Sequence, residues 1–182
     1  MLPLFLGLIL FQSCTDNSAD LSAFQIASAN GNLVNEGYNR CIRYVNDWMN
    51  YADTITGLIP RNINESRDYW NAWDAAADNY PFMVLTSSLT MPEFFRDRAT
   101  EILQTEERLT SRIGKLPDTY SFSKQGFRND IIDTSQLIFG SAEYMKDGLV
   151  PLTEWLGESP WSERMLGILD DLKGLERVVK EL

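Results

Sequence analysis

Apolar residues recur three and four positions apart over most of the chain, a spacing that predicts amphipathic helices. The first such run spans about residues 33–52 and has a clear apolar stripe: Val34, Tyr38, Cys41, Ile42, Val45, Trp48, Met49 and Ala52. Gly57 and Pro60 in "TGLIPR" come soon afterwards and predict the end of this helix.

The second predicted helix is placed by a proline. Proline is tolerated in the first turn of a helix and disfavours helical geometry at the residue before it, so Pro81 should stand just inside the start. We therefore expect Asp78 or Asn79 to be the N-cap. The following "FMVLTSSL" is nearly all apolar and predicts a buried helix.

Three further helices follow from the same signals. Thr90 and Glu93 form a capping-box pattern that predicts a third helix ending near Ile113. A fourth is expected over 127–147, stopped by Gly148, with one apolar face: Ile131, Ile132, Ser135, Ile138, Phe139, Ala142 and Met145. A fifth begins at Ser159-Pro160 and keeps its helical spacing to Leu182.

No segment alternates between apolar and polar residues for long enough to predict a strand. The expected fold is therefore all-α, with about five helices in antiparallel hairpins over residues 33–182 and no sheet beyond isolated bridges.

The N-terminus has a different character. Residues 1–13 contain a short apolar run from Leu2 to Phe11, and Ser13-Cys14 follows it, which is typical of a bacterial lipoprotein signal peptide with Cys14 as the lipidated residue. Residues 14–32 would then be a flexible polar tether, and the protein a membrane-anchored lipoprotein of the bacterial cell envelope. Two features depart from this pattern: no Lys or Arg precedes the run, and Phe11 replaces the usual aliphatic residue. The alternative is an ordinary apolar segment that docks on the core.

Composition excludes several function classes. The net charge of −10 argues against nucleic acid as a partner. The chain has no histidine, which excludes a Ser-His-Asp triad and a His-ligated zinc site within it, and two cysteines cannot form a four-thiolate metal site. We expect no metal and no cofactor, and acid–base chemistry would fall mainly to carboxylates.

Two stretches of the chain resemble each other. "YADTITGLIPR" and "YMKDGLVPL" each place Gly-Leu-(Ile/Val)-Pro after an aspartate, and each precedes a stretch that contains tryptophans. They predict either a repeat of helical hairpins with equivalent ends or a chance match of a short turn.

Helical hairpins with such turns resemble the (α/α) toroid proteins of the six-hairpin glycosidase superfamily. The resemblance covers roughly residues 33–182 and implies carbohydrate as the ligand, a concave face built from helix ends, and catalysis by acidic residues. Complete members have more helices than this chain supplies, which suggests a fragment.

The stretch "DYWNAWDAAADNYPFMV" from Asp68 to Val84 holds the candidate site. Asp74 and Asp78 are the candidate catalytic pair, because glycoside hydrolysis needs two carboxyl groups about 5–10 Å apart. Sugar rings would stack on aromatic faces and bond to amides and one arginine, which gives the candidate binding residues Arg61, Trp70, Asn71, Trp73, Asn79 and Tyr80. We expect Trp70 and Trp73 to line a cleft, and Phe82 and Leu85 to be core.

A purely structural interpretation is also open, in which Asp78 caps a helix and the tryptophans plug the core. Two functions are accordingly considered. One is a lipoprotein that acts on or binds glycans, in the manner of a glycoside hydrolase. The other is a non-catalytic helical lipoprotein that binds a glycan or a partner protein.

Overall fold

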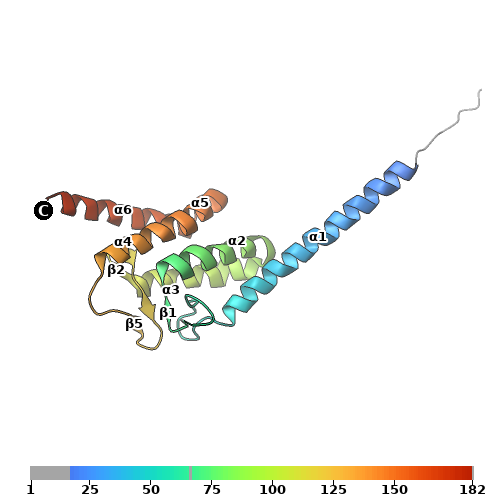
Figure 1. Cartoon of the computed structure of the whole chain (residues 1–182). Coiled ribbons are helices and arrows are strands. Elements are labelled where there is room, and N and C mark those ends of the chain that lie inside the picture. The colour runs from blue at the N-terminus through green and yellow to red at the C-terminus, as the bar shows by residue number, and fades with distance from the viewer. Residues whose placement is uncertain (1–16, 66, 182) are drawn as a thin grey trace, which may run out of the picture. The chain divides into compact units, whose positions relative to one another are not determined.

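The structure is a computed structural model that describes residues 17–65 and 67–181. The chain divides into two units, Met1–Gly37 and Tyr38–Leu182. The described residues are mostly helical, which confirms the all-α prediction, and they also form two small antiparallel sheets (Figure 1). The predicted signal peptide and the lipidation site at Cys14 lie outside the described residues.

Helix α1 (Asn17–Met49) begins earlier than predicted. Residues 17–32 were expected to be part of a flexible tether, and they are helical instead. This segment contains four alanines, which have the highest helix propensity, and no proline, and it has one glycine, Gly31.

The other helices form two successive hairpins (Figure 1). The first pairs the continuous helix of η1 (Ala72–Asn79) and α2 (Tyr80–Thr90) with that of η2 (Phe94–Ala99) and α3 (Thr100–Thr110). The second pairs the helix of α4 (Thr134–Glu143), η3 (Tyr144–Leu149) and α5 (Val150–Leu156) with α6 (Pro160–Glu181). Because α4 contacts η1 while α5 contacts α2, the first helices of the two hairpins run side by side in the same direction.

The second helix starts at Ala72, not after Asp78 as predicted, and its N-cap is Asn71. Pro81 therefore lies inside a continuous helix. Proline is tolerated there because the preceding η1 is π-helical. The wider turns of a π-helix leave room for the proline ring, and they make the N–H that proline lacks unnecessary at this position. Pro151 follows the π-helical η3 in the same way.

Asn71 is completely buried, and its Oδ1 accepts hydrogen bonds from the backbone N–H groups of Asp74 and Ala75, at 3.0 and 3.1 Å. We expect Asn71→Ala to lower the free energy of unfolding by about 1–2 kcal/mol, because both N–H groups lose their acceptor. Urea denaturation checks this value, and Asn71→Ser, which keeps an uncharged acceptor oxygen at the N-cap, should recover part of the loss. An unchanged midpoint in Asn71→Ala would contradict this role.

The two similar stretches of sequence are not equivalent helix ends. Gly57 lies in a turn with a φ of 73°, whereas Gly148 lies inside η3. A Cβ on Gly148 would lie 3.0 Å from the carbonyl oxygen of Ala76 and from the ring of Pro81. The glycine at 148 is therefore explained by close contact between the two parallel helices, and not by a turn.

The fourth helix also differs from its prediction. It begins at Thr134 and continues through Gly148 to Leu156. Its buried positions are Leu137, Gly140, Ser141, Tyr144, Gly148, Leu149 and Leu152. Six of the seven residues of the predicted apolar face are exposed: Ile131, Ile132, Ser135, Ile138, Phe139 and Ala142. The small residues face inward because the helices approach closely, and a Cβ on Gly140 would lie 2.9 Å from the ring of Trp73.

The short strands lie in the connections between helices. In the first sheet, β4 (Tyr120–Ser121) lies between β1 (Tyr69–Trp70) and β5 (Gly126–Phe127), antiparallel to both. The second sheet pairs β2 (Ser111–Ile113) with β3 (Leu116–Pro117) around Gly114. β1 thus leads directly into the N-cap of η1 and sets where the second helix starts.

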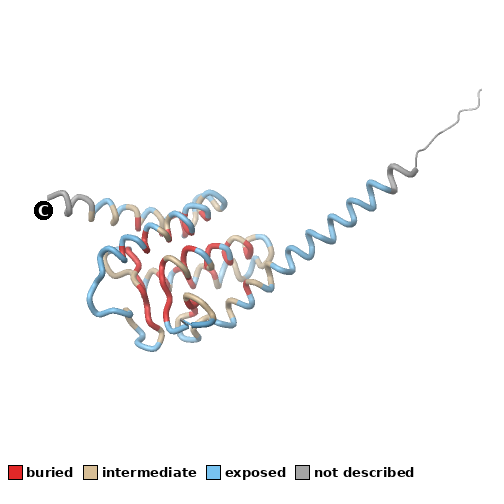
Figure 2. Tube along the Cα trace, in the orientation of Figure 1, coloured by how far each residue is buried: buried red, intermediate tan, exposed pale blue. Residues whose placement is uncertain are grey.

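The core lies between the helices of the two hairpins, and Figure 2 shows its buried positions. It includes a charged pair, since Arg164 of α6 and Glu106 of α3 are only 1% and 2% exposed. The Arg164 side chain donates to both oxygens of Glu106, at 2.7 and 3.1 Å. This ion pair ties the second helix of one hairpin to the second helix of the other.

Candidate functional site

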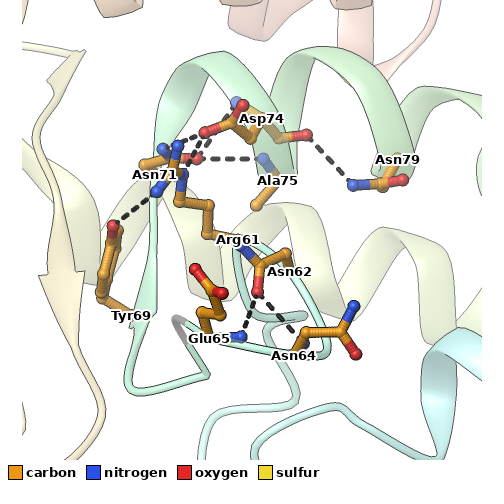
Figure 3. Close-up of polar contacts among 9 residues, drawn as sticks. All are labelled: Arg61, Asn62, Asn64, Glu65, Tyr69, Asn71, Asp74, Ala75 and Asn79. Atoms are coloured by element: carbon orange, nitrogen blue, oxygen red, sulfur yellow. Dashed lines mark hydrogen bonds and ion pairs between the residues drawn. The ribbon is translucent and has the colours of Figure 1, made fainter.

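A polar cluster surrounds Asp74 at the start of η1 (Figure 3). Arg61 Nε donates to Asp74 Oδ2 at 2.6 Å, and Asn71 Nδ2 donates to the same oxygen at 2.7 Å. Arg61 also donates through Nη1 to the hydroxyl of Tyr69, at 3.0 Å. Because Asp74 and Arg61 already pair with each other, their charges hold the loop against the helix start and are not free to clamp an acidic sugar.

The aromatic residues of the candidate site divide between the core and the surface. Trp70 is 2% exposed and Tyr80 is 4% exposed, so the structure overturns their proposed role as sugar platforms. The hydroxyl of Tyr80 donates to the carbonyl of Ala99 and accepts from the indole N–H of Trp161. Trp73 is half-buried against Phe139, with ring centroids 6.3 Å apart.

Asp78 is exposed and lies in a hollow between the two parallel helices. We call this hollow the acidic groove; it measures about 180 Å³ and is lined by Ala77, Asp78, Pro81, Phe82, Leu85, Asp147, Pro151 and Leu152. A second carboxylate, Asp147, therefore shares the groove with Asp78. Asp74, the other member of the predicted pair, is not among the residues that line the groove.

The electrostatics of the groove distinguish its two carboxylates. Partial burial raises the pKa of Asp78, and the negative charges of Asp74, Asp147 and Glu143 raise it further. Asp147 has a cation beside it, because Lys146 Nζ lies 3.2 Å from its Oδ2 and 2.8 Å from Glu143 Oε1. The groove thus brings together Asp78, whose pKa is raised, and Asp147, which has a neighbouring positive charge.

The raised pKa of Asp78 predicts a pH-dependent effect on stability. The folded state holds the proton more tightly than the unfolded state, so folding stability falls as pH rises above ~3.9, the ordinary pKa of Asp. Asp78→Asn removes this loss of stability, because asparagine does not ionise. Its melting temperature should exceed that of the parent at pH 7 by a small margin, because the side chain is exposed, and the margin should vanish near pH 3. A variant less stable than the parent at pH 7 would contradict the expectation.

Asn79 lies between the polar cluster and the surface. Its Oδ1 accepts from the hydroxyl of Tyr44 at 3.3 Å, and its Nδ2 donates to the backbone carbonyl of Asp74 at 3.4 Å. Phe82, which was predicted to be core, is 47% exposed and forms one wall of the groove. An α-helical spacing from Ala75 would place Phe82, seven positions later, on the same buried face. The π-helical η1 shifts this register, and Met83 and Val84 are buried instead.

No protein-family model, no curated protein and no solved structure matches the chain.

The described residues offer neither a metal-binding cluster nor a membrane span. Among them, no three His, Cys, Asp or Glu side chains are grouped in a way that would hold a metal ion. Across 17–65 and 67–181, every helix is too short or too polar to cross a membrane. Cys41 is a free, half-buried thiol.

Proposed function

We propose that the protein is a cell-envelope lipoprotein whose helical-hairpin domain binds carbohydrate in the acidic groove. The observation that carries this proposal is the shared position of Asp78 and Asp147 in one hollow with the exposed ring of Phe82. The lipoprotein part rests on the sequence around Cys14, and the choice of carbohydrate as ligand also follows from the resemblance of the sequence to the (α/α) toroid proteins.

The groove offers what a polyol requires. Carboxylate oxygens accept hydrogen bonds from sugar hydroxyls, and an aromatic ring packs against the apolar face of a sugar. Pro81, Leu85 and Pro151 supply further apolar surface around the two carboxylates. A ligand with hydroxyls on its edge and C–H groups on its face fits this combination.

A second candidate function is glycoside hydrolysis, and the raised pKa of Asp78 favours it. In such a reaction one carboxylic acid protonates the leaving oxygen, while a second carboxylate acts as base or nucleophile. Asp78 would be the acid and Asp147 the second carboxylate. Asp74, tied to Arg61, would be a positioning residue.

The test is a panel of soluble oligosaccharides, with binding measured by calorimetry and hydrolysis by release of reducing sugar. Binding that is weakened by Asp78→Asn and Asp147→Asn, and is unaffected by Asp170→Asn on α6, supports the proposal. Release of reducing sugar that is lost in Asp78→Asn supports hydrolysis. Binding by no member of the panel would overturn the carbohydrate proposal.

A further inference from the structure

A second hollow lies at the C-terminal end of α1. We call it the aromatic pocket; it measures about 140 Å³ and is lined by Tyr44, Asp47, Trp48, Tyr51 and Ile63. Three of its five residues are aromatic, and the Tyr51 side chain is 41% exposed. The guanidinium of Arg67 lies 5.0 Å from the ring centre of Tyr51, which holds this ring in place at the edge of the pocket.

The aromatic pocket is joined to the acidic groove by direct contacts. The ring of Tyr44, which lines the pocket, meets the ring of Phe82, which lines the groove, edge to face at a centroid distance of 4.9 Å. The hydroxyl of Tyr44 also donates to Asn79, the residue next to Asp78. Tyr44 and Phe82 thus form a shared wall between the two hollows.

The chemistry of the two linings is the same. Each combines carboxylate with aromatic surface: Asp47 with three rings in the pocket, and Asp78 and Asp147 with Phe82 in the groove. Among the described residues, neither lining includes a lysine or an arginine. Beside the linings, Lys146 lies 3.2 Å from Asp147 and Arg67 lies 5.0 Å from the ring centre of Tyr51, so the three carboxylates outnumber these two positive charges. A ligand rich in negative charge, such as a uronic-acid polymer, would be repelled by three carboxylates. An uncharged chain of sugars would not be, and its hydroxyls would find acceptors in both hollows.

We propose that the aromatic pocket is a second sugar subsite, so that the ligand of this protein is an uncharged oligosaccharide long enough to reach from the acidic groove to Trp48 and Tyr51. This inference rests on the proposed carbohydrate function and adds the chain length and charge of the ligand. It also assigns a role to Trp48, whose helical spacing alone indicates only a core position.

The experiment compares sugar chains of different length. Calorimetry measures the affinity of the parent protein for cello-, malto- and N-acetylchito-oligosaccharides, each as the disaccharide and the hexasaccharide. In at least one series the hexasaccharide should bind ten-fold or more tightly than the disaccharide. Equal affinities for both lengths in every series that binds would overturn the inference and leave the proposed function standing, whereas binding by no series would overturn both.

Substitutions in the aromatic pocket test which residues account for the higher affinity of the hexasaccharide. Trp48→Ala and Tyr51→Ala should bring the hexasaccharide down to the affinity of the disaccharide and leave disaccharide binding unchanged. Tyr51→Ala alters an exposed side chain beyond the end of α1, so it remains informative if Trp48→Ala does not fold. Trp155→Ala, which removes an exposed tryptophan of α5 outside both hollows, is the matched control and should change neither affinity. A loss of disaccharide and hexasaccharide binding by the same factor would overturn the assignment of a separate subsite.

A negatively charged oligosaccharide tests whether the ligand is uncharged. Hexagalacturonate should bind at least ten-fold more weakly than the best uncharged hexasaccharide at low ionic strength, because the linings carry three carboxylates. Tighter binding of hexagalacturonate than of every uncharged hexasaccharide would overturn the inferred ligand class.

Discussion

Arg164→Met should lower the free energy of unfolding by about 3–5 kcal/mol, because it leaves the carboxylate of Glu106 buried without a counter-charge. The native pair is almost fully enclosed, and Arg164 Nη1 also donates to the backbone carbonyl of Lys115. Glu106 would keep only the hydroxyl donors of Thr110 and Tyr144. Equilibrium urea denaturation followed by circular dichroism measures the loss.

The chain offers a matched control for this ion pair. Arg98 and Glu101 are 2.6 Å apart, but their side chains are 40% and 62% exposed. Arg98→Met should therefore cost no more than about 1 kcal/mol. In the double variant Arg164→Met with Glu106→Gln, the unpaired charge is gone and at least half of the lost stability should return. A double variant as unstable as Arg164→Met would show that lost packing, and not charge, causes the effect.

Trp70→Ala should lower the free energy of unfolding by about 3–5 kcal/mol, the cost of removing a large aromatic ring from a closed core. Trp70 is 2% exposed, and its strand β1 pairs with β4 through Tyr120. A cavity at this position also weakens the support of Asn71, the N-cap that follows it. Thermal and urea denaturation give the loss.

Two exposed aromatic residues serve as controls for Trp70. Trp155 is 58% exposed and Phe82 is 47% exposed, so their alanine variants should stay within about 0.5–1 kcal/mol of the parent. Phe82→Ala should in addition weaken sugar binding in the acidic groove. If Trp70→Ala were as stable as Trp155→Ala, Trp70 would not belong to the core, and its original assignment to a cleft would be restored.

Much of the fold follows from local signals in the sequence. The three- and four-residue spacing of apolar side chains predicts the helices, and the capping pattern at Thr90 and Glu93 places the third one close to its observed start. Ser159-Pro160 likewise marks the start of α6. These signals work because helix formation and capping depend on residues only a few positions apart.

The choice of buried face depended on tertiary contacts. The sequence predicted that Ile131, Ile138 and Phe139 would be core, because large apolar side chains are usually buried. The two parallel helices approach closely at Gly140 and Gly148, so the buried face of the fourth helix is the one that carries these glycines, and Ile138 and Phe139 lie off it. No local pattern reports how closely two segments that lie some seventy positions apart in the sequence will pack.

The candidate site shows the same division. From the sequence alone, Asp78 could be identified as a carboxylate in an aromatic stretch, and it does lie in a groove. Its partner there, Asp147, comes from the second hairpin, and Asp74 is occupied by Arg61. The sequence identified Asp78 as a candidate. The packing of the two hairpins decided which carboxylate shares its hollow, because that depends on helix direction and on contacts between distant parts of the chain.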